Sequence, residues 1–141
     1  KTKYLGELNY EHCITIRTSI IGHELTSHHG LIEWFLSQKE PCKGYVKAIF
    51  SGLPTIVLSE IIRDVIIDQS NLNGIYHISS NPISKYDLLM LVAKLYNKKI
   101  EIIPSDEIII DRSLNSLKFS KATGYKPPQW DNLINIMFKT K

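Results

Sequence analysis

Residues 13–22 constrain the fold of this chain most strongly. They read Cys-Ile-Thr-Ile-Arg-Thr-Ser-Ile-Ile-Gly, a run rich in β-branched side chains that ends on a glycine. β-Branched residues favour extended backbone, and a short apolar run between polar residues is typical of a strand buried on both faces. Such strands occur in parallel sheets that helices cover on both sides. The run therefore predicts a buried strand of a parallel sheet.

Helical and extended patterns alternate along the rest of the chain. Helix formers at residues 1–8 precede the first strand, and residues 74–79 form a second short apolar run after a turn. The strongest helix pattern begins after Ser84, where Asp87 completes a capping-box-like pair. Because strands alternate with helices, we expect an α/β fold with a parallel sheet.

The sequence also predicts the secondary structure of four further segments. Residues 44–50 are expected to form a strand and residues 55–57 a brief extended piece. A helix is then expected over about residues 58–67, because apolar side chains recur there at helical spacing, and a last helix over about residues 131–138.

The sequence also lacks a feature that α/β nucleotide-binding domains carry. No glycine-rich turn joins a strand to a helix, so no phosphate-binding loop of a dinucleotide-binding unit is present. The chain starts inside a helical run without a capping residue. We therefore expect residues 1–141 to be the C-terminal portion of a larger α/β protein.

The composition of the chain disfavours nucleic acid as a partner and gives no sign of a membrane span. The formal net charge is only +3, and no basic stripe with interleaved aromatic residues is present, so nucleic acid is not favoured. No apolar stretch approaches the roughly 20 residues of a membrane span, and no signal peptide is recognisable. Cys13 and Cys42 are too few for a disulfide framework, so we expect free thiols in a reducing cytoplasm.

Three histidines, His23, His28 and His29, raise the question of a metal site. Glu24 and Glu33 are the only carboxylates nearby, and the spacing matches no recognised metal-binding pattern. We expect no metal, and interpret this segment as a polar loop that lines a cleft. A serine hydrolase is also disfavoured, because no Gly-x-Ser-x-Gly elbow occurs.

Two arginines stand in unusual surroundings. Arg17 lies inside the apolar run, where a guanidinium must either pair with a carboxylate or face a ligand. Arg112 follows Asp111 in a segment rich in Ser and Asn. It could pair with a neighbouring acid or bind an anion such as a phosphate.

Six short motifs follow one another in a definite order and together resemble one known family. They are Lys3-Tyr4-Leu5-Gly6-Glu7; Arg17-Thr18-Ser19 with Gly22; Gly52-Leu53-Pro54-Thr55; Gly74-Ile75-Tyr76-His77-Ile78-Ser79 with Ser84-Lys85-Tyr86-Asp87; Arg112-Ser113-Leu114-Asn115-Ser116-Leu117; and Thr123-Gly124-Tyr125 with Pro127, Pro128 and Trp130. In this order they resemble the extended short-chain dehydrogenase/reductase family, most closely its dTDP-4-dehydrorhamnose reductase branch.

The resemblance implies the C-terminal portion of an NAD(P)-binding Rossmann-like doubly wound sheet plus a small substrate-binding subdomain. Residues 1–22 would carry the end of the catalytic helix and the strand after it. Residues 23–141 would carry mostly the substrate-binding portion, with a returning strand near residues 74–79. The activity implied is reduction of a 4-keto nucleotide sugar by NAD(P)H, in deoxysugar and surface polysaccharide biosynthesis.

The resemblance also implies roles at the cofactor. Lys3 matches the lysine of the family's Tyr-x-x-x-Lys pair, and the tyrosine would lie upstream of residue 1. An ammonium near a phenol favours phenolate, so Lys3 would be a catalytic and cofactor-binding residue. Thr18, Ser19 and Ile20 would line the nicotinamide end of the cleft. Ile20 stands where well-known reductases carry a tryptophan, so the resemblance does not define the sugar.

On the substrate side the resemblance points to His28, Gly52, Thr55, Arg112 and Asn115, with Arg112 at the diphosphate. Most of the cofactor would be bound by an N-terminal Rossmann half, supplied in cis or in trans, and a homodimer is possible. The isolated 141 residues are expected to be inactive. The alternatives are a nucleotide-sugar epimerase or dehydratase of the same family, or a non-catalytic nucleotide-sugar-binding fragment.

Overall fold

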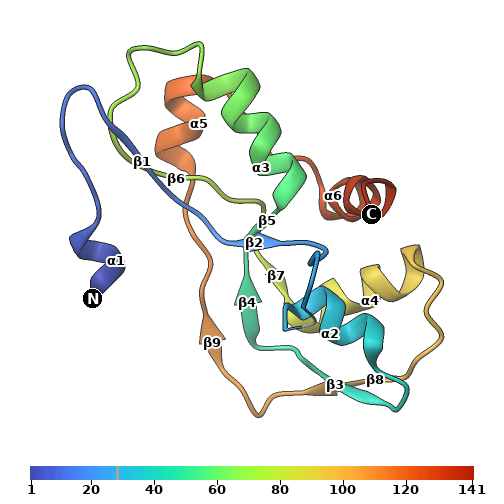
Figure 1. The fold of residues 1–141 in the computed structure, drawn as a ribbon. Coiled ribbons are helices and arrows are strands. Elements are labelled where there is room, and N and C mark those ends of the chain that lie inside the picture. The colour runs from blue at the N-terminus through green and yellow to red at the C-terminus, as the bar shows by residue number, and fades with distance from the viewer. Residues whose placement is uncertain (28) are drawn as a thin grey trace.

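The computed structural model describes residues 1–27 and 29–141, which form an α/β fold of short elements (Figure 1). The helices are α1 (Thr2–Leu5), α2 (Leu31–Ser37), α3 (Thr55–Ile61), the π-helical turn η1 (Ile62–Ile66), α4 (Lys85–Leu95), α5 (Leu117–Thr123) and α6 (Trp130–Lys139). The strands are β1 (Ile14–Arg17), β2 (Ile20–Ile21), β3 (Cys42–Tyr45), β4 (Ala48–Phe50), β5 (Leu53–Pro54), β6 (Gly74–His77), β7 (Ile83–Ser84), β8 (Ile102–Ser105) and β9 (Ile110–Asp111).

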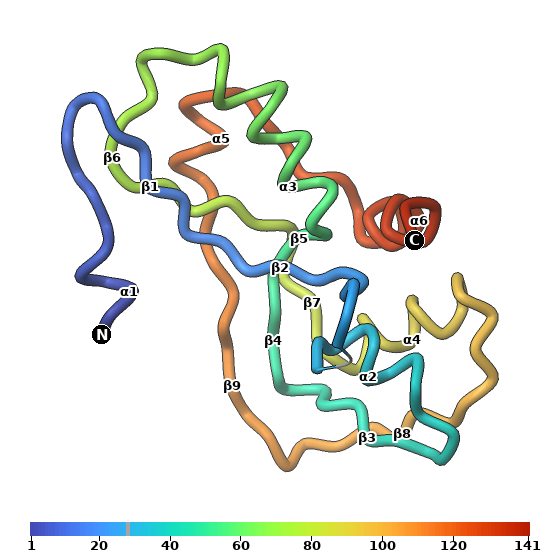
Figure 2. The backbone as a smooth tube through the Cα atoms, viewed as in Figure 1, coloured from blue at the N-terminus to red at the C-terminus, as the bar shows by residue number. Residues whose placement is uncertain are grey.

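The strand pairs are mostly parallel, as expected. β1 pairs with β6, β2 with β5, and β3 with β8, all in parallel. β4 is the middle strand of a mixed sheet, antiparallel to β7 and parallel to β9. α5 lies beside β6, α3 beside β2 and β5, and α4 beside β3 and β8 (Figure 1). The two termini lie on opposite sides of the view in Figure 2.

The run at residues 13–22 does not form one strand. The Thr18 hydroxyl donates to the carbonyl oxygen of Ile78 (2.8 Å), and the carbonyl of Ser19 accepts from the amide of Leu53 (2.8 Å). The chain therefore changes its pairing partner between the two strands: β1 pairs with β6, and β2 pairs with β5. A strand ladder cannot continue through such a change of partner, so the run divides.

The expectation that β1 is buried on both faces is wrong, because all four of its residues are only partly buried. Alternate side chains of a strand point to opposite faces. Ile14 and Ile16 pack against the core, whereas Thr15 and Arg17 contact residues 7–8 through polar groups. One face of β1 is therefore apolar and the other is polar.

The expected segment boundaries also shift elsewhere. Residues 55–57 are helical, not extended, because the β2–β5 ladder ends at the Ile21–Pro54 pair and α3 begins directly after Pro54. The expected strand at residues 44–50 is two strands, β3 and β4, separated by a turn. The predicted start of α4 is confirmed: the Ser84 hydroxyl accepts from the Asp87 amide (3.0 Å) and lies 2.8 Å from its carboxylate.

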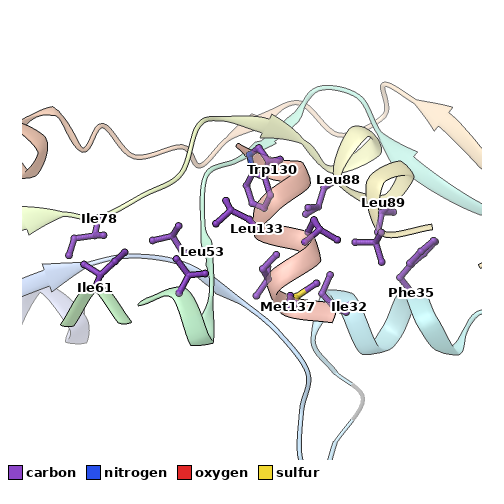
Figure 3. Packing of buried hydrophobic residues seen from close by; sticks show 14 of the residues in the cluster. Ile32, Phe35, Leu53, Ile61, Ile78, Leu88, Leu89, Trp130, Leu133 and Met137 are labelled. Carbon is purple, nitrogen blue, oxygen red and sulfur yellow. The ribbon is translucent and has the colours of Figure 1, made fainter. Parts of the chain in front are cut away.

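The core lies around α6 (Figure 3). Leu133 and Met137 of this helix are buried between side chains of α2 and α4 on one side and of β5 and α3 on the other. Trp130 begins α6, and its indole N–H donates to the carbonyl oxygen of Asn81 (2.7 Å). α6 thus packs between α2 and α4 on one side and β5 and α3 on the other. No helix among the described residues is both long and apolar enough to cross a membrane.

Candidate functional site

A hollow of about 530 Å³ opens where β2, β4 and β9 meet the starts of three helices. Leu31, Thr55 and Lys85 are the first residues of α2, α3 and α4, and all three line it. Apolar side chains form much of the wall, from Ile20 of β2, Phe50 of β4 and their neighbours. A volume of this size is in the range of small-molecule sites.

Few charged side chains line the hollow. They are Lys85, Arg112 and Glu24, with the titratable His23 beside them. Arg112 follows β9, and its backbone amide donates to the carbonyl oxygen of Ile49 (3.0 Å), which places it at the edge of the β4–β9 pair. An apolar wall with a few convergent charged groups is typical of a ligand site.

Glu24 organises the loop at one side of the hollow. Its carboxylate accepts hydrogen bonds from the Ser27 hydroxyl (2.8 Å), the His29 amide (2.9 Å) and the Gly30 amide (2.9 Å). These donors lower the pKa of Glu24, with the Ser27 hydroxyl as the largest cause. The carboxylate is therefore held by its own loop and remains ionised.

His23 lies in the wall of the hollow and links α2 and α4 behind it. Its Nδ1 is 2.6 Å from a Glu33 carboxylate oxygen on α2, and its Nε2 is 2.7 Å from the hydroxyl of Tyr96 at the end of α4. Burial raises the pKa of Tyr96 to about 12, so this phenol stays protonated. Both ring nitrogens of His23 have partners, so its role in this arrangement is to hold the wall in place.

Four of the sequence-predicted site residues come together in the hollow. Ser19 and Ile20 were expected at the nicotinamide end, and Thr55 and Arg112 on the sugar-nucleotide side. Ser19 and Arg112, the two that are furthest apart in the sequence, are separated by 93 positions. The Ile20 side chain is 54% exposed and presents an apolar surface there.

Three other predicted residues lie elsewhere. The Thr18 hydroxyl is used in the backbone contact between β1 and β6, as described above. Gly52 is buried and has a packing role, because a Cβ there would meet the Phe50 ring and the Ser19 carbonyl. The side-chain oxygen of Asn115 accepts from the Leu117 amide (2.9 Å) at the start of α5. Asn115 lines a second, polar hollow of about 510 Å³.

The predicted lysine lies apart from the hollow. Lys3 is exposed on α1, a helix without buried residues, and does not line the 530 Å³ hollow. His28 lies outside the described residues. Of the two possibilities for Arg17, the carboxylate is confirmed: its guanidinium donates two hydrogen bonds of 2.6 Å to Glu7. This contact lowers the pKa of Glu7.

Lys85 lines the hollow although no role was predicted for it from the sequence, where it appears only within the motif Ser84-Lys85-Tyr86-Asp87. A signal was present, since a lysine directly after a capping serine opposes the helix dipole. No group of three metal-binding side chains converges within residues 1–27 and 29–141.

Comparison with solved structures shows the fold that this chain shares. The dTDP-4-dehydrorhamnose reductase of Yersinia enterocolitica has a TM-score of 0.72 at 20% identity, over 90% of this chain and 49% of the reductase. The same enzyme of Bacillus anthracis, in complex with NADP, has a TM-score of 0.71 at 18% identity, over 91% and 48%. The Bordetella bronchiseptica enzyme WbmG, in complex with NAD and UDP, has a TM-score of 0.63 at 15% identity, over 89% and 43%.

The chain has the fold of the C-terminal half of these enzymes. It spans about half the length of the solved structures that it matches. The α/β prediction and the resemblance in fold are therefore confirmed. No family model matches the sequence, and no curated protein matches it either.

Proposed function

We propose that this chain is the substrate-binding part of an NAD(P)H-dependent reductase of a 4-keto nucleotide sugar, in deoxysugar and surface polysaccharide biosynthesis in the cytoplasm. The observation that carries the proposal is the 530 Å³ hollow, because Ser19 and Ile20 line it together with Thr55 and Arg112. Residues assigned to the cofactor end and residues assigned to the substrate side thus share one cavity. Solved structures with the same fold include dTDP-4-dehydrorhamnose reductases, one of them in complex with NADP, and RMD of Pseudomonas aeruginosa in complex with NADPH.

The wall of the hollow fits one end of a nicotinamide cofactor. Ile20 offers an exposed apolar surface that suits a flat ring, and Ser19 lies next to it. NAD(P)H would supply a hydride to the keto carbon, and an N-terminal half would hold most of the cofactor. In the mechanism proposed here, Thr55 and Arg112 hold the nucleotide sugar. Lys3, which lies outside the hollow, would lower the pKa of a tyrosine of the N-terminal half, and that tyrosine would donate the proton to the keto oxygen.

The proposal is tested at Lys3 in the full protein that contains this chain. Lys3→Ala is expected to reduce turnover of a 4-keto nucleotide sugar at least about 100-fold, the lower range for loss of acid–base catalysis. Lys1→Ala is the matched control, since both lysines are exposed in the same segment. Unchanged turnover in Lys3→Ala would contradict the role of this lysine.

A second candidate activity is epimerisation or dehydration of the same class of substrate. It is supported by the dTDP-glucose 4,6-dehydratase of Bacillus anthracis, whose TM-score with this chain is 0.61 at 17% identity. The reductases of Yersinia and Bacillus score higher, at 0.72 and 0.71, and favour reduction. Product analysis with several 4-keto nucleotide sugars separates the two, because only reduction consumes NAD(P)H stoichiometrically. A fragment that binds the nucleotide sugar without catalysis would bind but form no product.

A further inference from the structure

Two cationic side chains line the same hollow without a partner of their own. Among the described residues, neither Lys85 nor the Arg112 guanidinium takes part in a hydrogen bond or an ion pair. The other two arginines of the chain are paired, Arg17 with Glu7 and Arg63 with Asp64. Lys85 is partly buried, unlike an ordinary solvated lysine. The hollow therefore contains positive charge that the chain itself does not neutralise.

The register of the mixed sheet determines the distance between the backbone positions of Lys85 and Arg112. Ile49 of β4 lies opposite Ser84 of β7 and also opposite Asp111 of β9. Neighbouring strands are about 4.8 Å apart, so β7 and β9 are separated by about 10 Å. Lys85 and Arg112 directly follow Ser84 and Asp111, but β7 and β9 run in opposite directions, so the two residues are also offset along the strands by two positions, roughly 7 Å. Their long side chains thus extend from either side of β4 and can reach a common group.

Helix stability does not account for the position of Lys85. It is the first residue of α4, at the positive end of the helix dipole, where a cation is unfavourable. Ser84 already provides the cap, and Asp87 provides the negative charge of the first turn. A cation placed against the dipole and inside a cavity is better explained by an anionic ligand.

The surroundings strengthen an interaction with an anion. Ile49, Phe50 and Ile110 form an apolar wall of the same hollow, and hydrogen bonds between charged groups are stronger than neutral ones. Glu24, the carboxylate in the same hollow, already accepts three hydrogen bonds from its own loop.

We propose that Lys85 is the second cation of a diphosphate site and that Lys85 and Arg112 bind the diphosphate of the nucleotide sugar from the two sides of β4. This inference rests on the proposed function. It assigns a ligand-binding role to a residue for which the sequence resemblance gave none. It also commits the two cations to the substrate and not to the diphosphate of the dinucleotide cofactor.

The test is calorimetric titration of the full protein that contains this chain with dTDP, UDP, thymidine and NADPH. Lys85→Met is expected to weaken binding of dTDP or UDP about tenfold or more, the loss of one hydrogen bond from a charged group. Thymidine and NADPH are expected to bind as before. Lys85→Arg is expected to retain most of the affinity, because it keeps the charge.

Lys94→Met is the matched control, since it removes the same charge from an exposed position of the same helix. Thermal melting of each variant separates a folding defect from a binding defect, and loss of diphosphate affinity with an unchanged melting temperature supports the proposal. Wild-type affinity in Lys85→Met overturns this inference alone. An equal loss of NADPH affinity also overturns it, because the cations would then belong to the cofactor. A wild-type protein that binds neither dTDP nor UDP overturns the proposed function together with the inference.

Discussion

Gly52 is the position where one methyl group is expected to disturb both the fold and the hollow. A Cβ at this residue would lie 2.6 Å from the carbonyl oxygen of Ser19 and still closer to the ring of Phe50. The Phe50 ring can turn aside, but the Ser19 carbonyl belongs to the backbone and accepts the Leu53 amide at 2.8 Å. Gly52→Ala must therefore push β2 away from β5.

The size of the effect follows from two opposing terms. Inserting a methyl group into a close-packed site costs about 1–3 kcal/mol. The backbone of Gly52 does not require a positive φ, so the reduced entropy of the unfolded chain returns about 0.4–1 kcal/mol. The net loss in free energy of unfolding is about 1–2 kcal/mol. In the full protein that contains this chain, the melting temperature is expected to fall by roughly 2–8 °C.

Urea denaturation followed by circular dichroism measures the free energy, and nucleotide titration measures the hollow. Gly52→Ala is expected to weaken nucleotide binding as well, because Ser19 and Phe50 both line the cavity. Gly6→Ala is the matched control: its Cβ would come no closer than 3.6 Å to another group, the carbonyl of Lys3. A melting temperature within about 1 °C of wild type in Gly52→Ala would refute the steric argument.

Two further predictions concern acid stability and assembly. The guanidinium of Arg17 lowers the folded pKa of Glu7 below its ordinary value of 4.5, so the stability from this pair is present above that value and is lost as the pH falls through the folded pKa. Glu7→Gln should therefore reduce the melting temperature at neutral pH but have little effect at low pH; equal losses at both would contradict this. Among the described residues only β6 pairs with β1, so the other edge of β1 is expected to pair with an N-terminal half, in cis or in trans, or with a second copy. Size-exclusion chromatography of the 141 residues should show self-association or aggregation, and a cooperatively melting monomer would argue against it.

Local chemistry made some elements predictable. The start of α4 follows from Ser84 and Asp87, which bond to each other as a capping pair should. The parallel direction of β1 and β6 follows from two short apolar runs separated by helical patterns. The break between β1 and β2 was not predictable, because it depends on where Leu53 and Ile78 lie in space.

The candidate site divides in the same way. Arg112 could be proposed from sequence, since a cation in a Ser- and Asn-rich segment can bind an anion such as a phosphate. Gly52 and Asn115 matched motifs, but their roles in packing and in the start of α5 depend on contacts that a motif does not encode. Lys85 reaches the hollow only through the register of β7, β4 and β9, which the sequence pattern does not specify.

The hollow is assembled from β2, the β4–β5 segment, the start of α4 and the β9 region, which are distant in the chain. An unfolded chain cannot bring these segments together, so a ligand of the hollow binds the folded state alone. By mass action, such a ligand at a concentration 100 times its dissociation constant adds about 2.7 kcal/mol to the free energy of unfolding. The melting temperature of this protein is therefore itself a detector for its ligand, and a panel of nucleotides and nucleotide sugars can be ranked by it without any assay of catalysis.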